Sequence, residues 1–378
     1  MSAPSLQLDP NERVHVLGLG SIGTFMAYCL TDVPSRPCTT LMLHRPALYD
    51  AFKKNNEKIS ITTTKQTQEH GRFNAEGSNA EGFDAEGFDA EVLDNDGSWR
   101  RTTRQQSTTE QTNPHWENTT NEPIRQLVVA TKTIHTVGAL KPLQSRLTPE
   151  TTILFMQNGM GIVEEVNRSL FTDPVSRPKY LLGVISHGVG RDAPFRITHT
   201  GFAAASVGPS SSRPEEQGSD YLLRTLPQSP LLNATAYSYE DVLQMQLEKL
   251  IVNSYCNPVC ALHDSKNGIL LGETHRKLKL ELFAEVVQII HRMPELQGVE
   301  GLKNRFGMER LEATVDGILE KTRNTTCSMV WDLRAKRETE IAFINGYWVK
   351  KGIELGVDTP VNNMLVHRIQ EIQSSWRA

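Results

Sequence analysis

The sequence has few cysteines, little net charge and no long apolar run, and each shortage excludes a class of protein. Its 378 residues include five cysteines, most of them inside apolar segments, which argues against a disulfide scaffold and favours reduced core thiols. A formal net charge of -4 offers no basic field to nucleic acid or to an anionic membrane. No apolar run approaches the length of a transmembrane helix. We therefore expect a small diffusible partner, with no nucleic acid and no membrane.

Other absences concern targeting, metal binding and assembly. The N-terminal stretch MSAPSLQLDPNER lacks both the apolar core of a secretory signal and the Arg-rich character of a transit peptide, so we expect a cytoplasmic protein. Cys256 and Cys260 are one helical step apart, but no other His or Cys pair completes a metal site, and we expect none. The sequence does not show the oligomeric state, and a homodimer is kept as an open alternative.

The first motif is a glycine-rich turn. A β-rich run at residues 13–17 leads into GLGSIG and then into an apolar helical segment. The first glycine of such a turn permits a tight bend, the second lets a pyrophosphate approach the backbone, and the third lets helix pack on strand. The pattern is weak alone but strong between a strand and a helix. It predicts a dinucleotide site whose cofactor contacts are Gly18, Leu19, Gly20, Ser21, Ile22 and Gly23.

The residue after the second predicted strand indicates which dinucleotide binds. Residues 39–43 form this strand, and His44 and Arg45 follow it. An NAD site usually has an acidic residue there, whereas a cation suits the 2′-phosphate of NADP(H). We therefore predict NADP(H) as the cofactor. The alternative is that Arg45 is an ordinary surface charge.

The composition changes abruptly between about residues 65 and 122. This stretch is rich in Gln, Thr, Asn, Glu and Gly, and it contains the pentapeptide repeat NAEGS-NAEGF-DAEGF-DAEVL at residues 74–93. So few aliphatic residues should not bury enough surface to offset the entropy of ordering. We therefore expect a mobile surface insertion, and deletion of the repeat at residues 74–93 should leave the melting temperature nearly unchanged. The role of the repeat is not evident from the sequence.

Strand patterns resume after the insertion. One predicted strand covers residues 124–130 and is followed by Thr131 and Lys132. A second covers residues 152–156 and is followed by QNGMG. Because open α/β sheets hold ligands at the carboxyl ends of their strands, Lys132 and Asn158 are candidate cofactor contacts. Residues 181–185 and 197–207 should continue the sheet, and from Tyr237 onward almost every apolar pattern is helical.

The predicted helix that begins near Asp241 has an unusual polar stripe. Asp241 can serve as its cap, and Lys249, Asn253 and Asn257 follow one another at four-residue spacing beside an apolar face. Pro258 removes the helical donor to the carbonyl of Ser254 and should bend the helix there. The stripe is either a solvated face or a site that binds a polar ligand.

Four sequence blocks carry a resemblance to the ketopantoate reductase (2-dehydropantoate 2-reductase) family, and in particular to fungal-type members. They are GLGSIG, QNGMG, EKLIVNSYCNPVCALHDSKNG at residues 248–268, and SMVWDLRAKRETEIAFINGYWVKKGIELGVDTPVN at residues 328–362. The resemblance implies an α/β fold. An N-terminal Rossmann-type doubly wound parallel sheet at residues 1–228 would carry the insertion and precede an all-α domain at residues 229–378. NADPH and substrate would lie in the cleft between them.

The resemblance also implies roles for individual residues. Lys249 matches the family's catalytic lysine, and Glu340 matches its late acidic residue; both are expected to be catalytic, and Glu340 should contact substrate or cofactor. The substrate residues are Lys249, Asn253, Asn257, Asn267 and Ser328, and the further cofactor residues are Arg45, Lys132, Asn158 and Glu340. The implied reaction is NADPH-dependent reduction of 2-dehydropantoate to (R)-pantoate in pantothenate and coenzyme A biosynthesis.

General chemistry is consistent with these roles. Hydride transfer to a ketone builds charge on oxygen, which a protonated amine such as Lys249 can stabilise and protonate. Burial lowers a lysine pKa, while Glu340, placed near the start of a helix expected at residues 339–355, favours the cation. Glu340 could instead be an ordinary first-turn helix acid. Two other functions stay open: reduction of another 2-oxo acid, and a non-catalytic NADP(H) sensor.

Overall fold

The computed structural model describes residues 12–64, 67–69, 72–74, 80–94, 96–102 and 116–376, and it divides into two compact units. The first unit runs to Gln157 and continues over Glu165–Val242. The second contains Asn158–Glu164 and Leu243–Ala378. The sequence predicts one boundary after residue 228; the two compact units divide after Val242, and Asn158–Glu164 is grouped with the helical unit.

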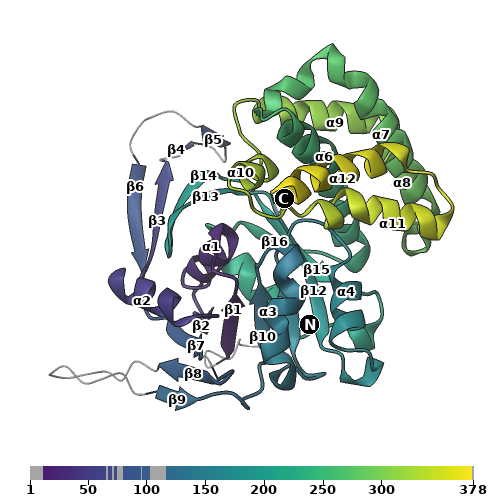
Figure 1. Ribbon diagram of the computed structural model, residues 1–378. Coiled ribbons are helices and arrows are strands. Elements are labelled where there is room, and N and C mark those ends of the chain that lie inside the picture. The colour runs from purple at the N-terminus through teal and green to yellow at the C-terminus, as the bar shows by residue number, and fades with distance from the viewer. Residues whose placement is uncertain are drawn as a thin grey trace. The chain divides into compact units, whose positions relative to one another are not determined.

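The strands of the first unit form a ten-stranded sheet and a four-stranded sheet, with a further two-stranded pair (Figure 1). Their bounds are β1 (Arg13–Leu17), β2 (Cys38–Leu43), β3 (Ile59–Thr64), β4 (Thr67–Glu69), β5 (Arg72–Asn74), β6 (Ala80–Ala85), β7 (Asp89–Leu93), β8 (Trp99–Thr102), β9 (Trp116–Asn118), β10 (Gln126–Val129), β11 (Thr152–Phe155), β12 (Lys179–Ile185), β13 (Gly188–Ala193), β14 (Arg196–Gly201), β15 (Ala205–Pro209) and β16 (Ala234–Ala236).

The large sheet has the order β16-β15-β12-β11-β10-β1-β2-β7-β8-β9. Its middle, from β7 through β2, β1, β10 and β11 to β12, is parallel throughout. Central strands such as β1 and β10 are buried along almost their whole length, which explains their largely apolar sequences. The prediction of an N-terminal Rossmann-type α/β unit is confirmed.

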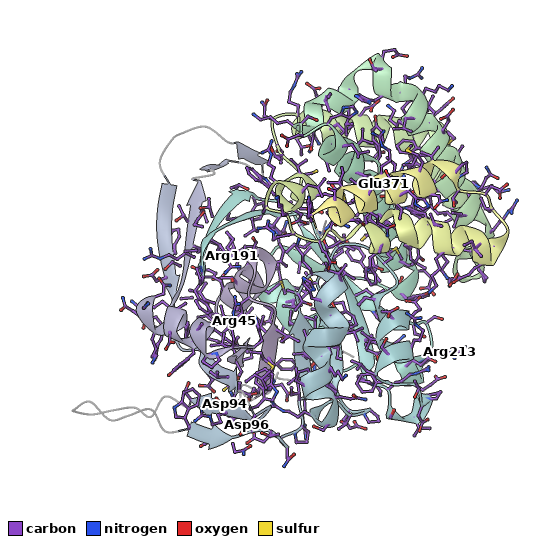
Figure 2. The ribbon with its side chains drawn as sticks, in the orientation of Figure 1. Arg45, Asp94, Asp96, Arg191, Arg213 and Glu371 are labelled. Carbon is purple, nitrogen blue, oxygen red and sulfur yellow. The ribbon has the colours of Figure 1, made fainter. Side chains whose placement is uncertain are left out.

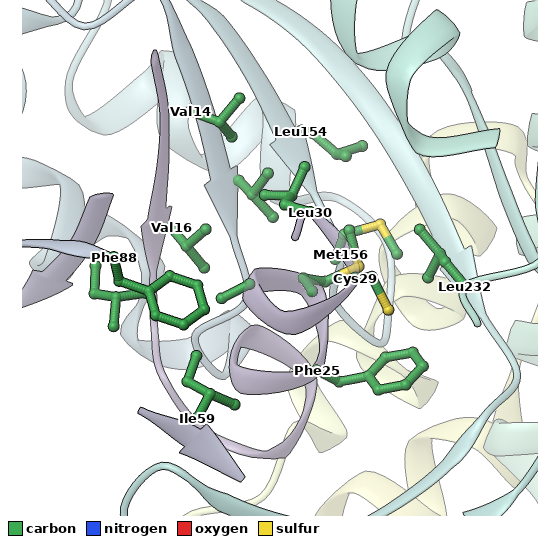
Figure 3. Close-up of a cluster of buried hydrophobic side chains, with 14 of the residues drawn as sticks. Val14, Val16, Phe25, Cys29, Leu30, Ile59, Phe88, Leu154, Met156 and Leu232 are labelled. Carbon is green, nitrogen blue, oxygen red and sulfur yellow. The ribbon is translucent and has the colours of Figure 1, made fainter. Parts of the chain in front are cut away.

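Helices cover this sheet. Those of the first unit are α1 (Ser21–Cys29), α2 (Pro46–Lys54), α3 (Thr136–Leu140) and α5 (Tyr221–Thr225), with short 3-10 helices η1 (Thr133–His135), η2 (Lys141–Arg146), η3 (Pro174–Ser176), η4 (Pro214–Glu216) and η5 (Leu226–Gln228); α4 (Ile162–Ser169) begins in the segment assigned to the second unit. Helix α1 lies between the large sheet and the four-stranded sheet (Figure 1). Its buried Phe25 and Cys29 pack in one apolar cluster with Val16 and Ile59 (Figure 3).

The prediction for residues 197–207 was only partly right. Strand β15 joins the large sheet beside β12, but β14 pairs with β13 and β3 in the four-stranded sheet. The sequence predicted strands correctly but could not assign them to sheets, since neighbouring strands in the chain separate into different layers here.

The prediction of a loop without a core between about residues 65 and 122 is wrong for the described part of that stretch. Strand β7 pairs in parallel with β2, and β8 and β9 extend the same sheet. Repeat residues 80–85 form β6, and residues 89–93 form β7. Val92 and Trp99 are buried. Repeat residues 75–79, and residues 65–66, 70–71, 95 and 103–115, lie outside the described residues.

A buried ion pair explains part of this error. Glu91 of β7 is fully buried, and its carboxylate accepts hydrogen bonds from Arg146, itself 1% exposed, at 2.7 and 3.3 Å. Burial would raise the pKa of Glu91, but His15, 3.4 Å away, and the hydrogen-bonded guanidinium of Arg146 lower it to about 2. An acidic residue therefore holds β7 in the sheet, although the sequence suggests a solvated position.

The second unit is helical, as predicted. It is built from α6 (Tyr239–Leu262), of which the part from Leu243 onward lies in this unit, α7 (Glu273–Arg292), α8 (Leu302–Arg305), α9 (Met308–Lys321), α10 (Ser328–Arg334), α11 (Asn345–Leu355) and α12 (Pro360–Ser375), with 3-10 helices η6 (Asn267–Leu271), η7 (Pro294–Leu296) and η8 (Ile341–Phe343). Among the described residues, no helix combines the length and apolar character needed to cross a membrane.

Candidate functional site

The glycine loop has the geometry expected of a dinucleotide site. Gly18 has φ +94°, and a Cβ there would overlap the backbone of Thr131. A Cβ on Gly23 would overlap the carbonyl of Gly18, so both positions require glycine for packing. Gly20 differs, because a Cβ there would meet no heavy atom within 4 Å. The loop is thus tightly packed at its first and third glycines and open at the second.

The start of α1 can accept an anion. Gly20 is its N-cap, without a side-chain cap hydrogen bond, and no acidic residue lies in the first turn. The N–H groups at a helix start lack intrahelical acceptors and carry the positive end of the helix dipole. Ser21 and Ile22 belong to this first turn, and Leu19 precedes it, all three half-buried. The open backbone at Gly20 and the uncapped helix fit the pyrophosphate of a dinucleotide.

Arg45 lies at the carboxyl end of β2, as predicted. It is exposed, is the N-cap of α2, and is labelled in Figure 2. Within the described residues it forms no ion pair, so the guanidinium can meet a phosphate from solvent. Burial, and then the charge of Arg45, lowers the pKa of neighbouring His44. Arg45 is therefore the cation of this strand end at neutral pH.

Lys132 is carried by a turn that a glutamine side chain holds. It is the N-cap of η1, directly after β10. The Nε2 of Gln157 donates to Thr131 O at 2.6 Å and lies 2.6 Å from Thr136 Oγ1. These contacts hold the carbonyl directly before Lys132 and the hydroxyl of Thr136, which in turn donates to Lys132 O at 3.3 Å. The sequence analysis missed this role of Gln157, although the position after β11 could have suggested it.

Asn158 belongs to the helical unit. The QNGMG segment bonds to the residues before α11 through Met160 N and Phe343 O, 2.8 Å apart. Gly159 has φ +82°, and a Cβ there would lie 2.6 Å from the same carbonyl. The glycines thus allow a close approach to the segment that carries Glu340, which places Asn158 in the same unit as Glu340.

Helix α6 carries the predicted polar stripe. It begins at Tyr239, two residues before the proposed cap Asp241; Ser238 has the capping contacts instead, with its Oγ accepting from Asp241 N at 3.2 Å. The helix continues through Pro258. The apolar face is buried, while Lys249 and Asn253 are half-buried and Asn257 is 5% exposed. The stripe is therefore not a fully solvated face.

Lys249 has a perturbed pKa. Desolvation lowers it from 10.5 to about 8, and the negative charge of Glu340 opposes this shift. Glu340 is 9% exposed and precedes η8. The single helix expected at residues 339–355 is instead divided into η8 and α11 by Ile344, whose φ of −102° and ψ of −89° are not helical. The break sets Glu340 on a turn within electrostatic reach of Lys249.

The asparagines of the predicted site fall into two groups. Within the described residues, the side-chain amides of Asn253 and Asn257 have no hydrogen-bond partner, and a ligand could supply one. Asn267 is different, because its Nδ2 donates to Thr322 Oγ1 at 3.1 Å and its Oδ1 lies 3.9 Å from Cys260 Sγ. Its amide already contributes to the packing of η6.

Ser328 is exposed at the start of α10. The preceding Cys327 lies against α6, with its Sγ 3.7 Å from Asn257 O. Lys249, the three asparagines, Ser328, Glu340 and Asn158 therefore all belong to the second unit, and the glycine loop, Arg45 and Lys132 belong to the first. One unit presents phosphate-binding features, and the other presents a lysine with neutral hydrogen-bonding groups.

Comparison with known proteins agrees with this division. The ketopantoate reductase PanE/ApbA profile matches residues 14–212, and the ketopantoate reductase PanE/ApbA C-terminal profile matches residues 241–373. A probable 2-dehydropantoate 2-reductase of Schizosaccharomyces pombe is 27% identical over 376 residues, covering 94% of this chain and 95% of the relative. The 2-dehydropantoate 2-reductase of Vibrio cholerae is 31% identical over 250 residues, covering 66% and 78%.

A solved structure shows the same fold. D-mandelate dehydrogenase in a ternary complex with NADH and anilino(oxo)acetate superposes with a TM-score of 0.70 at 17% identity, over 97% of this chain and 100% of that one. The two profiles together span both units and include the glycine loop, the α6 stripe and Glu340. The chain therefore belongs to the ketopantoate reductase family.

Proposed function

We propose that this protein reduces 2-dehydropantoate to (R)-pantoate with NADPH, with Lys249 as the general acid. The observation that carries the proposal is a half-buried lysine whose pKa is lowered to about 8, near an acidic residue and beside two amides available to a ligand. A general acid works best when its pKa is close to the working pH. A lysine on a solvated face would not show this pKa.

Each group in the second unit has a chemical task in this proposal. NADPH, when bound, supplies a hydride to the C2 carbonyl carbon of the substrate. Lys249 donates a proton from Nζ to the carbonyl oxygen as negative charge develops there, and solvent later returns the proton to the neutral amine. Glu340 keeps Lys249 cationic in spite of burial.

The neutral groups orient the substrate. Asn253 and Asn257 follow Lys249 at one-turn intervals of about 6 Å along α6, so they can hold the oxygens of a 2-oxo acid without adding charge. Ser328 can donate to the substrate carboxylate. Asn267, whose amide already has partners, supports these groups from η6. The orientation of reacting atoms matters, because a 1 Å misplacement can cost about a hundredfold in rate.

The first unit would hold the cofactor. Gly20 and the start of α1 fit the pyrophosphate, Arg45 fits the 2′-phosphate, and Lys132 lies at a strand end where such ligands bind. In the second unit, Asn158 and Glu340 are the proposed further cofactor contacts. An arginine at the end of β2 favours NADPH over NADH.

The reaction is tested by following NADPH absorbance with the purified chain and a panel of 2-oxo acids. We expect 2-dehydropantoate to give the highest kcat/KM, NADH to be a poorer donor, and Lys249→Ala to lose turnover while still binding NADPH. If the folded wild-type protein oxidised NADPH in the presence of none of the tested 2-oxo acids, the proposal would be contradicted and the sensor alternative would remain.

We place the enzyme in the cytoplasm and keep the homodimer as a proposal, which fractionation and light scattering would test.

A second candidate is the reduction of a different 2-oxo acid. The observation that favours it is that a D-mandelate dehydrogenase of the same fold binds anilino(oxo)acetate, an oxoacetate with an aromatic substituent, beside NADH. The substrate panel distinguishes the two candidates: an aromatic 2-oxo acid with a kcat/KM above that of 2-dehydropantoate would select the second.

A further inference from the structure

Pro258 leaves one backbone carbonyl of α6 without its helical hydrogen bond. A proline has no N–H, so the carbonyl of Ser254, four residues earlier, cannot receive its helical hydrogen bond. Ser254 is fully buried, and water cannot easily substitute. This carbonyl lies between Asn253 and Asn257, the two residues proposed to orient the substrate. An unsatisfied carbonyl here would loosen the helix at its functional turn.

Asn345 supplies the missing donor. Its Nδ2 lies 2.8 Å from Ser254 O and 2.9 Å from Asn362 Oδ1, so both amide hydrogens have acceptors. Asn345 is fully buried and is the first residue of α11, directly after the non-helical Ile344. It lies five positions after Glu340 in the chain. One side chain therefore ties the substrate-binding turn of α6 to the segment that carries Glu340.

The orientation of these amides is set by a buried carboxylate. Glu285 of α7, 6% exposed, accepts from Val361 N at 2.6 Å, from Asn362 N at 3.1 Å and from Asn362 Nδ2 at 2.7 Å. A hydrogen-bonded carboxylate can only accept, so Asn362 must turn its Nδ2 toward Glu285 and its Oδ1 toward Asn345. Asn345 must then present Nδ2 to both acceptors.

The opposite orientation of Asn345 would face its oxygen toward two other oxygens. Within the described residues, the Oδ1 of Asn345 is buried and has no hydrogen-bond partner, a cost that the observed orientation accepts. The network thus runs through four helices, from Glu285 on α7 through Asn362 on α12 and Asn345 on α11 to Ser254 on α6. Because Glu285 can only accept hydrogen bonds, each amide in the network turns its Nδ2 toward the acceptor that precedes it.

We propose that Asn345 is a positioning residue for the reductase site, oriented by Asn362 and Glu285, which holds the turn of α6 between Asn253 and Asn257 and keeps it in register with Glu340. The inference rests on the proposed function, since it gives the network a role in the reaction as well as in folding. It assigns Asn345 no contact with substrate or cofactor.

The test compares Asn345→Ala in two backgrounds, the wild type and Pro258→Ala. Pro258→Ala restores an N–H that can bond to Ser254 O, so it should replace part of what Asn345 supplies. We expect Asn345→Ala to lower kcat/KM about 10- to 100-fold in the wild type. In the Pro258→Ala background the loss should shrink to a few-fold. The exposed neighbour Asn363→Ala is the matched control and should leave kcat/KM unchanged.

The pH profile separates positioning from simple destabilisation. Activity should fall as pH rises through the pKa of Lys249, which is about 8 in the wild type. If Asn345→Ala lets Glu340 move away, Lys249 loses the negative charge that raises its pKa. The high-pH limb of the activity profile should then shift to lower pH. A variant that is only less stable would keep the wild-type limb at temperatures well below its melting point.

Two outcomes would overturn the inference. One is an equal loss of kcat/KM on Asn345→Ala in both backgrounds. The other is an Asn345→Ala variant that melts at a lower temperature but keeps the wild-type kcat/KM and the wild-type pH limb. If Asn345→Ala does not fold, Asn345→Ser, which keeps one donor, is compared in the same two backgrounds with the same criteria. Wild-type turnover is measured first, so its absence would refute the proposed function before any variant is compared.

Discussion

Replacing Lys249 with methionine should abolish most activity and at the same time stabilise the protein. The methionine keeps an apolar stem of similar length but carries no charge. Burial lowers the pKa of Lys249 from 10.5 to about 8, even with Glu340 favouring the cation, so the folded protein holds this charge at a cost. Removing the charge removes that cost together with the proton donor.

The magnitude follows from the pKa shift. The difference between 10.5 and about 8 is about 2.5 units, and at about 1.36 kcal/mol per unit it sets an upper limit near 3 kcal/mol. Because Lys249 is half-buried and partly screened by solvent, we expect a gain of about 1–3 kcal/mol at neutral pH. Turnover should fall by about 10²- to 10⁴-fold.

The pH dependence of the gain provides a check of its cause. Between about pH 8 and 10.5 the unfolded chain still binds the proton on Lys249 and the folded chain does not, so wild-type stability rises relative to the variant through this window. Urea unfolding of both proteins across it should show the gain shrinking toward zero. A Lys249→Met variant that is less stable at neutral pH would indicate a structural ion pair, and near-normal turnover would remove Lys249 from the chemistry.

Three further predictions concern other parts of the molecule. Arg45→Asp should weaken NADPH binding by about 1.5–3 kcal/mol and NADH binding much less; equal losses in calorimetric titrations would show that Arg45 does not contact the 2′-phosphate. Asn253→Ala should mainly raise KM for the 2-oxo acid in steady-state assays, whereas an unchanged KM would argue against a contact with substrate. Arg146→Met should cost about 3–5 kcal/mol in urea unfolding, because it removes both hydrogen bonds that the buried carboxylate of Glu91 accepts and leaves, among the described residues, only His15 and Arg101, at 3.4 and 3.6 Å. A near-zero change would show that this ion pair does not hold β7 in the sheet.

The local features of both units could be predicted from the order of the amino acids. Gly18, Gly20 and Gly23 are recognisable because a tight turn with a close backbone approach requires glycine at fixed spacing. Helix α6 and its polar stripe are recognisable because a helix places residues four apart on one face. The cation after β2 could be located for the same reason, since strand ends are local features. These predictions depend only on interactions within a few residues of one another.

Features that depend on partners far away in the sequence could be recognised only in the folded chain. Strand β7 could not be predicted from its composition, because its stability comes from pairing with β2 and from Arg146, which lies 55 positions from Glu91 in the sequence. The break at Ile344 was missed for a similar reason, since nothing local ends that helix. The sequence showed that Pro258 leaves the carbonyl of Ser254 without a donor, but only the folded chain brings Asn345, 91 positions away, to supply it. Buried polar groups take whichever partner the fold provides, and sequence spacing does not encode that choice.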